Sequence, residues 1–151
     1  MPPENNTTPQ TPLSAAGKRI LIIEDENFIG DLYERALKAG GYEPTIVIDG
    51  AEALKEAQTN VYDIILLDIM LPNMTGTEIL TTLRNPELTP NLKAKIIITT
   101  NLELDDDGRA AIESKADGYI VKADITPKEL VTFLDQIDLH GTSQSSGSTP
   151  A

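Results

Sequence analysis

The stretch YDIILLDIMLPNMTG, from Tyr62 to Gly76, carries the strongest structural signal in the sequence. Its apolar run from Ile64 to Leu67 has the length and the Ile/Leu content of a β-strand buried on both faces of a sheet. The run ends on a single carboxylate, Asp68, and a Pro-Asn turn follows. Because ligands bind outside the carboxyl ends of strands in an open parallel sheet, Asp68 is placed for chemistry.

The composition limits the classes of partner. The chain has 151 residues, 40% of them hydrophobic, which suits one domain with a real core. Its 24 acidic and 12 basic residues give a formal charge of -12, which argues against binding to nucleic acid or to anionic membranes. The absence of cysteine and of a secretory signal favours the reducing cytoplasm. We therefore expect a cytoplasmic protein with no direct nucleic-acid or membrane partner.

The two ends differ in composition from the rest of the chain. Residues 1–17 are rich in Pro, Thr and Asn, and residues 139–151 are rich in Ser and Gly. Neither segment offers enough apolar surface for a core, so we expect both to be disordered. The folded domain is predicted to span residues 18–138.

Within that domain, short apolar strands alternate with amphipathic helices. We expect strands at 20–23, 43–48, 64–67, 95–100 and 119–121, and helices at 26–39, from 50, from 76, from about 105 and at 127–137. Thr75 with Glu78, and Thr126 with Glu129, have the spacing of capping boxes at two helix starts. The alternation predicts an α/β fold, with a doubly wound five-stranded parallel sheet covered by helices on both faces.

Polar side chains stand at the carboxyl ends of four expected strands, and these ends share one edge of the sheet. They are Glu24, Asp25, Asp68, Thr100 and Lys122. Two carboxylates about 4 Å apart repel by roughly 4 kcal/mol at an effective dielectric constant near 20. Either one acid keeps a proton or a hard cation binds, and donors that are all oxygen suit Mg²⁺ or Mn²⁺. The charges of a divalent ion and Lys122 would cancel those of the three acids, which favours the ion.

A carboxylate nucleophile, a divalent ion, a lysine and a hydroxyl are the parts that phosphoryl transfer requires. The sequence therefore predicts an aspartyl phosphate on Asp68. The ion would bridge Asp25, Asp68 and a phosphoryl oxygen, with Glu24 acting directly or through water. Lys122 and Thr100 would hold the remaining oxygens.

Four segments in order carry a family resemblance: Glu24-Asp25-Glu26, Asp68 to Gly76, Thr100, and Tyr119 to Lys122. Together they resemble the receiver domain of two-component response regulators, of the chemotaxis-regulator type, over residues 18–138. The resemblance implies a flavodoxin-like sheet with strand order 2-1-3-4-5. It also implies that a histidine kinase or histidine phosphotransfer protein donates the phosphoryl group. The chain would then be a signalling protein that catalyses at most its own phosphorylation and dephosphorylation.

The same resemblance assigns further roles. The backbone carbonyl of Met70 would complete a metal shell with Glu24, Asp25 and Asp68. Thr100 would move toward the phosphoryl group while Tyr119 changes rotamer. That change would alter the face formed by the fourth helix, fifth strand and fifth helix, where a downstream protein would dock.

Three positions depart from the family pattern. Ala123 stands where a proline, often cis, usually follows the lysine. Since a cis bond before a non-proline residue costs about 2.5–4 kcal/mol, we expect a trans Lys122-Ala123 peptide and a rerouted loop. Asn101 replaces a small residue, and its bulk is expected to limit access to the phosphoryl group. Lys115 replaces the glycine that commonly ends the fourth helix.

Other functions fit less well. In a flavodoxin-like electron carrier, the Glu24-Asp25-Glu26 loop would repel the FMN phosphate. In an Asp-nucleophile phosphohydrolase, a second acid would occupy the place of Met70. A receiver-like scaffold that binds partners without phosphorylation remains an alternative. Nothing in the sequence resembles an output domain, so we expect the receiver to act alone or within a longer protein.

Overall fold

The computed structural model describes residues 17–101 and 104–140. The terminal segments predicted to be disordered, 1–17 and 139–151, lie almost entirely outside this range. The described strands and helices alternate in chain order: β1 (Arg19–Ile23), α1 (Asn27–Ala39), β2 (Glu43–Val47), α2 (Gly50–Gln58), β3 (Ile64–Asp68), α3 (Gly76–Leu83), β4 (Lys95–Thr100), α4 (Asp106–Glu113), β5 (Gly118–Val121), the 3-10 turn η1 (Lys122–Asp124) and α5 (Pro127–His140). Helix α5 therefore ends three residues beyond its predicted end. Within the described part, no helix is long and apolar enough to cross a membrane.

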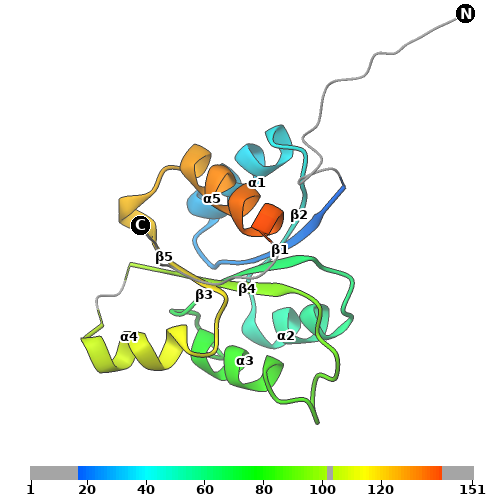
Figure 1. The fold of residues 1–151 in the computed structure, drawn as a ribbon, viewed down its shortest axis with the longest axis vertical. Helices are drawn as coiled ribbons and strands as arrows, with labels where there is room; N and C mark the ends of the chain where they lie inside the picture. Colours follow the sequence, from blue (N-terminus) through cyan, green and yellow to red (C-terminus); the bar gives the residue numbers. More distant parts are fainter. Residues whose placement is uncertain (1–16, 102–103, 141–151) are drawn as a thin grey trace, which may run out of the picture.

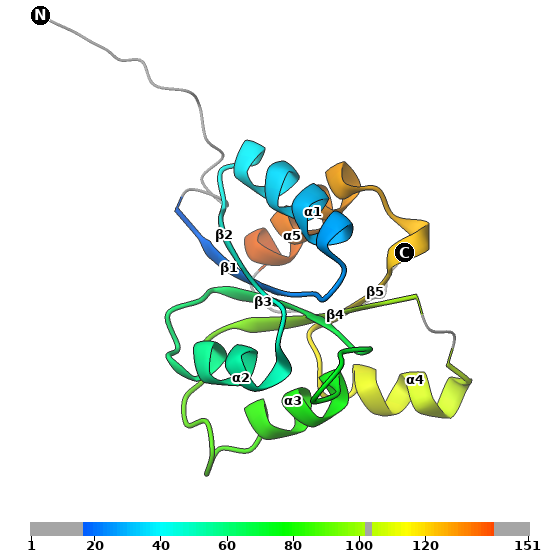
Figure 2. The same cartoon turned by 180° about the vertical axis from the view of Figure 1, so that it is seen from behind.

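The five strands form one parallel sheet with the order β2-β1-β3-β4-β5. Helices α1 and α5 cover one face, and α2, α3 and α4 cover the other (Figures 1 and 2). The doubly wound fold and the strand order are thus confirmed. Because all strands run in parallel, their carboxyl ends meet at one edge, which is where the polar residues were predicted to gather.

The central strands are buried on both faces. In β3, Ile65 and Leu67 belong to the core beneath α2 and α3, whereas Ile64 and Leu66 belong to the core beneath α1 and α5. The side chains alternate between the two cores because successive residues of a strand point to opposite faces of the sheet. Asp68 is the last residue of this strand rather than the first residue after it.

Both predicted capping boxes are present. The Thr75 hydroxyl accepts the Glu78 N–H at 3.1 Å while Glu78 accepts the Thr75 N–H at 3.0 Å. Thr126 and Glu129 make the same reciprocal pair at the start of α5, at 3.0 and 2.9 Å. These bonds satisfy backbone donors that the first turn of a helix leaves unpaired.

The end of α4 has a substitute for the missing glycine at Lys115. Arg84, directly after α3, donates from Nε to the Lys115 carbonyl and from its guanidinium to Asp117 at 2.8 Å. The same Asp117 oxygen accepts the Ile96 N–H at 2.8 Å. The Arg84 side chain, from just after α3, therefore satisfies a carbonyl just beyond α4, and Asp117 ties this segment to β4.

Helix α1 differs from the apolar pattern read from the sequence. Phe28 and Leu37 both fall on the apolar helical repeat of residues 26–39, yet Phe28 is 73% exposed while Leu37 is fully buried. Tyr33, which the pattern did not include, is buried beneath this helix. The first turn itself still reaches the core, because Ile29 packs against the cluster beneath α1 and α5 and Gly30 is buried.

Candidate functional site

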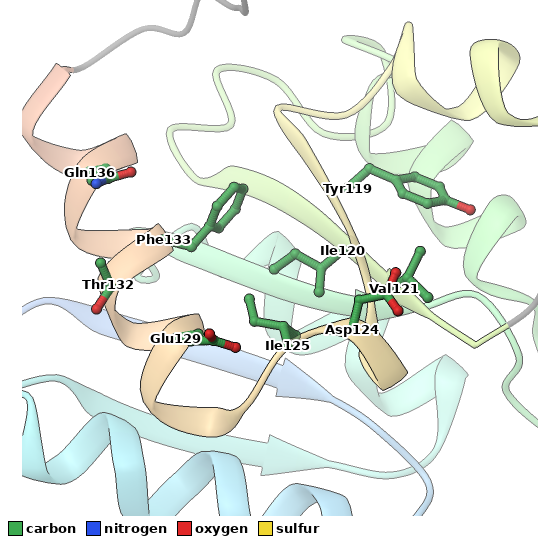
Figure 3. A pocket seen from close by; sticks show the side chains of 9 residues that line it. All are labelled: Tyr119, Ile120, Val121, Asp124, Ile125, Glu129, Thr132, Phe133 and Gln136. Carbon is green, nitrogen blue, oxygen red and sulfur yellow. The ribbon is translucent and has the colours of Figure 1, made fainter.

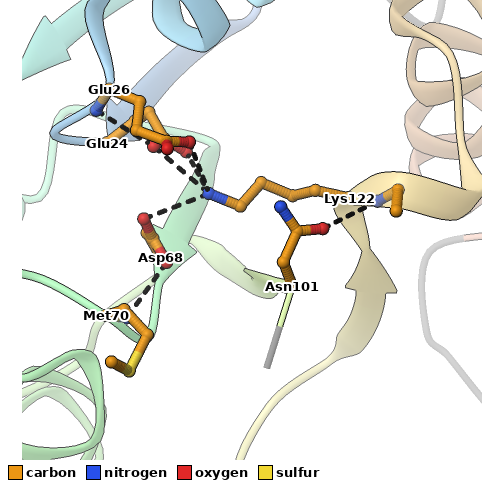
Figure 4. A network of polar contacts seen from close by, with 7 residues as sticks. Glu24, Glu26, Asp68, Met70, Asn101 and Lys122 are labelled. Carbon is orange, nitrogen blue, oxygen red and sulfur yellow. Dashed lines mark hydrogen bonds and ion pairs between the residues drawn. The ribbon is translucent and has the colours of Figure 1, made fainter. Parts of the chain in front are cut away.

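Asp68 forms the floor of a cavity at the carboxyl edge of the sheet. Only 2% of its surface is exposed. One carboxylate oxygen, Oδ1, accepts the Met70 N–H at 3.0 Å, and the other, Oδ2, lies 3.2 Å from Lys122 Nζ (Figure 4). Burial raises the pKa of Asp68, although the charge of Lys122 and the Met70 N–H act in the opposite direction.

Lys122 reaches the cavity from the end of β5 and contacts three acids. Its Nζ lies 3.0 Å from Glu24, 3.2 Å from Asp68 and 3.7 Å from Glu26 (Figure 4). Burial by itself would lower the pKa of Lys122. Its hydrogen bond to Glu24 and the charges of Asp68 and Glu24 outweigh burial, so the pKa is raised and the ammonium group stays charged.

Glu24 is the most strongly perturbed acid of the site. It is 2% exposed, and burial raises its pKa from 4.5 to about 7, with the charge of Asp68 acting in the same direction. Hydrogen bonds from Lys122 and from the Glu26 N–H oppose this rise. Near neutral pH, a proton on Glu24 therefore relieves the repulsion between the acids, which is one of the two solutions expected from the sequence.

The other solution, a bound cation, also fits the residues. Glu24, Asp25 and Asp68 can each offer a carboxylate oxygen such that the three atoms lie within 4.8 Å of one another. Asp25 is partly buried and, with Met70 and Lys122, lines a cavity of about 300 Å³ above Asp68. Three carboxylate oxygens are hard donors of the kind that Mg²⁺ prefers.

Thr100 and Tyr119 differ in how deeply they are buried in the protein. Thr100 is the last residue of β4 and is fully buried, one residue before Asn101 at the cavity wall. Tyr119 is partly buried on β5, and its ring lies against α4, where the Arg109 guanidinium is 4.5 Å from the ring centroid. It lines a second cavity, of about 460 Å³, between β5 and α5 (Figure 3).

The Lys122-Ala123 peptide is trans, as predicted from the absence of proline, and the described chain contains no cis peptide. The backbone then enters the 3-10 turn η1. From the sequence, only the bulk of Asn101 was expected to matter. In the structure its side chain also accepts a hydrogen bond. Its Oδ1 accepts the Ala123 N–H at 2.9 Å.

Sequence reasoning missed three further features near the site. Glu26 contacts Lys122, which the acidic run at 24–26 hinted at. Asn73 donates to Asp49 at 2.6 Å and so ties the loop after β3 to the start of α2. Burial raises the pKa of Tyr33 to about 12 beside the charged cluster, and no local pattern singled this residue out.

The chain has clear relatives among known proteins. The family model for the response regulator receiver domain matches residues 20–135. Response regulator ArlR of Staphylococcus saprophyticus is 41% identical over 104 residues, which is 69% of this chain and 45% of that protein. The alkaline phosphatase synthesis transcriptional regulatory protein PhoP of Bacillus subtilis is 35% identical over 113 residues, 75% of this chain and 45% of its own length. The chain thus spans about half the length of these curated relatives.

Solved receiver domains share the fold over their whole length. The CheY-like response regulator receiver domain protein from Methanospirillum hungatei has 30% identity and a TM-score of 0.70, and the match covers 83% of this chain and 96% of that one. The receiver domain of a sensor histidine kinase from Pseudomonas aeruginosa, with a magnesium ion coordinated in its active site cleft, has 29% identity and a TM-score of 0.69, covering 82% and 98%. The converging acids, the strand order and these matches lead to one conclusion: the chain belongs to the response regulator receiver domain family.

Proposed function

We propose that Asp68 accepts a phosphoryl group from a histidine kinase or a histidine phosphotransfer protein. The contact of 3.2 Å between Asp68 Oδ2 and Lys122 Nζ, inside a cavity walled by two more acids, is the observation that carries this proposal. A carboxylate oxygen of Asp68 attacks phosphorus as the bond from phosphorus to the donor nitrogen breaks. The nitrogen takes up a proton as it leaves. Lys122 offsets the negative charge that the incoming group adds.

Mg²⁺ or Mn²⁺ would be held by Glu24, Asp25, Asp68 and the backbone carbonyl of Met70. Such an ion neutralises charge on the transferring phosphoryl group. The magnesium ion in the similar Pseudomonas receiver domain supports this assignment. Because burial raises the pKa of Glu24 to about 7, a proton on this carboxyl group would compete with the ion, since carboxylates bind metals in their ionised form.

Phosphorylation would change the structure outside the site through Thr100, at the end of β4. Thr100 would contact the phosphoryl group, and Tyr119 would change rotamer against α4. The face formed by α4, β5 and α5 would then differ between two states and bind a downstream protein in one of them. We place this exchange of protein partners in the cytoplasm, within the receiver unit formed by residues 18–138.

The test is incubation of the chain with Mg²⁺ and acetyl phosphate, followed by intact-protein mass spectrometry. We expect a mass gain of one phosphoryl group that disappears in Asp68→Asn and when Mg²⁺ is chelated. Glu87→Gln, in the exposed loop at the opposite edge of the sheet, is the matched control and should be modified like the wild type. A gain that persists in Asp68→Asn would refute the assignment of the acceptor, and no gain would favour the scaffold alternative.

A further inference from the structure

Two of the unusual residues of this chain meet across the cavity rim. Asn101 follows the end of β4, and Ala123 follows Lys122 at the end of β5. Asn101 Oδ1 accepts the Ala123 N–H at 2.9 Å (Figure 4). The bond exists only because residue 123 is not proline, since proline has no backbone N–H. The substitution at 123 thus creates a donor, and the substitution at 101 provides its acceptor.

This bond fixes the orientation of the Asn101 amide. A backbone N–H can donate only to the carbonyl oxygen of a side-chain amide, so Oδ1 must face Ala123 and Nδ2 must face the other way. Figure 4 shows the nitrogen on the side of the Lys122 side chain. Asn101 also belongs to the lining of the cavity above Asp68. Among the residues that the structure describes, Nδ2 has no hydrogen-bond partner.

The side chains that line the cavity offer few hydrogen-bond donors to an anion. Its lining contains the acids Asp25, Glu26 and Asp68, and Lys122 already contacts Glu24 and Asp68. A phosphoryl group brings three oxygens that accept hydrogen bonds. A side-chain amide with one end already bonded needs little further ordering to donate to one of them.

We propose that Asn101 is a phosphoryl-binding residue: its Nδ2 donates to an oxygen of the group on Asp68, and the Ala123 N–H positions it for this contact. The inference rests on the proposed function and deepens it. It gives this receiver a donor on a side chain at a position where the family pattern has a small residue. The rim of the cavity then helps to hold the phosphoryl group as well as restricting access to it.

The experiment measures binding of beryllofluoride, a stable mimic of a phosphoryl group on a carboxylate, by calorimetry in saturating Mg²⁺. Because a hydrogen bond to a charged group contributes about 1.5–3 kcal/mol, Asn101→Ala should weaken binding by about tenfold or more. Asn101→Asp keeps the oxygen for Ala123 but replaces the donor with a negative charge, so it should weaken binding at least as much. Binding of Mg²⁺ alone should be unchanged in Asn101→Ala.

Two further variants test the role of Ala123. Ala123→Gly keeps the N–H and should bind beryllofluoride like the wild type, whereas Ala123→Pro removes it and should bind more weakly than Ala123→Gly. Asn85→Ala is the matched control, because Asn85 also accepts a backbone N–H, at 2.9 Å from Glu87, but lies at the opposite edge of the sheet. Circular dichroism and thermal melting establish that each variant is folded before its affinity is compared.

The outcomes separate the two proposals. Unchanged affinity in Asn101→Ala would overturn the present inference and leave the acceptor role of Asp68 intact. Equal affinities in Ala123→Gly and Ala123→Pro would overturn the positioning role of the Ala123 N–H. A wild-type chain that neither binds beryllofluoride nor gains mass from acetyl phosphate would overturn both proposals together.

Discussion

The pKa of Glu24 predicts how the stability of this protein depends on pH. Glu24 is 2% exposed, and its pKa rises from 4.5 to about 7 on folding because of burial first and the charge of Asp68 second. Between these values the folded state keeps a proton that the unfolded state releases. The contribution of Glu24 to the free energy of unfolding is therefore fully present below pH 4.5 and is lost as the pH rises through about 7.

The magnitude follows from the same two values. The interval from 4.5 to about 7, at about 1.36 kcal/mol per pKa unit, corresponds to a loss of about 3 kcal/mol. The raised pKa of Asp68 acts in the same direction, and Lys122 stays charged throughout this range. At the proposed metal site Mg²⁺ should oppose the loss, since it would bind the ionised acids and would stabilise the folded state more at about pH 8 than at about pH 5.

Urea unfolding followed by circular dichroism, from acid to mildly alkaline pH, measures this dependence. Other titrating groups also change stability with pH, so the informative quantity is the difference between wild type and Glu24→Gln. Gln cannot ionise, so the variant should gain stability relative to the wild type as the pH rises. Parallel profiles for the two proteins, without Mg²⁺, would refute the reasoning about Glu24.

Three further substitutions have defined outcomes. Lys122→Ala leaves two buried acids without their cation, so it should destabilise by about 3–5 kcal/mol at alkaline pH and by less in acid, as urea unfolding at two pH values would show. Gly76→Ala places a Cβ against the Asp68 carbonyl oxygen and 2.6 Å from the Cα of Ile69. The backbone must shift to relieve these contacts, which should lower the free energy of unfolding by about 3 kcal/mol and reduce the yield of phosphorylated protein. Arg84→Ala should cost about 2 kcal/mol through the lost bonds at the end of α4, measured against Arg35→Ala, an exposed arginine on α1 that should cost little. Equal stability of the two arginine variants would contradict the capping role of Arg84.

The sequence predicted the features of this fold that have a local cause. The run from Ile64 to Leu67 is long enough and apolar enough to identify a buried strand without any knowledge of its neighbours. Thr75 and Glu78 are three residues apart, so their reciprocal hydrogen bonds follow from spacing alone. Parallel strands place their carboxyl ends together, which is why the acids and Lys122 could be expected to converge.

Features that depend on distant contacts were not predicted from local patterns. The strand order came from the family resemblance, because alternating strands and helices permit several orders. Lys122 was expected near the acids, but its direct hydrogen bond to Glu24, 98 positions away, was not predicted. The bond between Asn101 and Ala123 depends on two loops that meet only in the folded sheet. Phe28 has an apolar side chain at the start of an amphipathic helix, but it is exposed, while its neighbour Ile29 packs against the core.

The stacking of Arg109 on Tyr119 has a consequence for the position that the ring prefers. Arg109 also bonds Glu113 at 2.7 Å, one turn along α4, so the guanidinium is tied to its own helix as well as to the ring. A ring that turns away from α4 gives up a cation–π contact, which is worth about 0.5–1 kcal/mol at an exposed site. That energy weights the two ring positions by about two- to fivefold before any ligand binds. The contact with α4 thus favours the ring position that the structure shows.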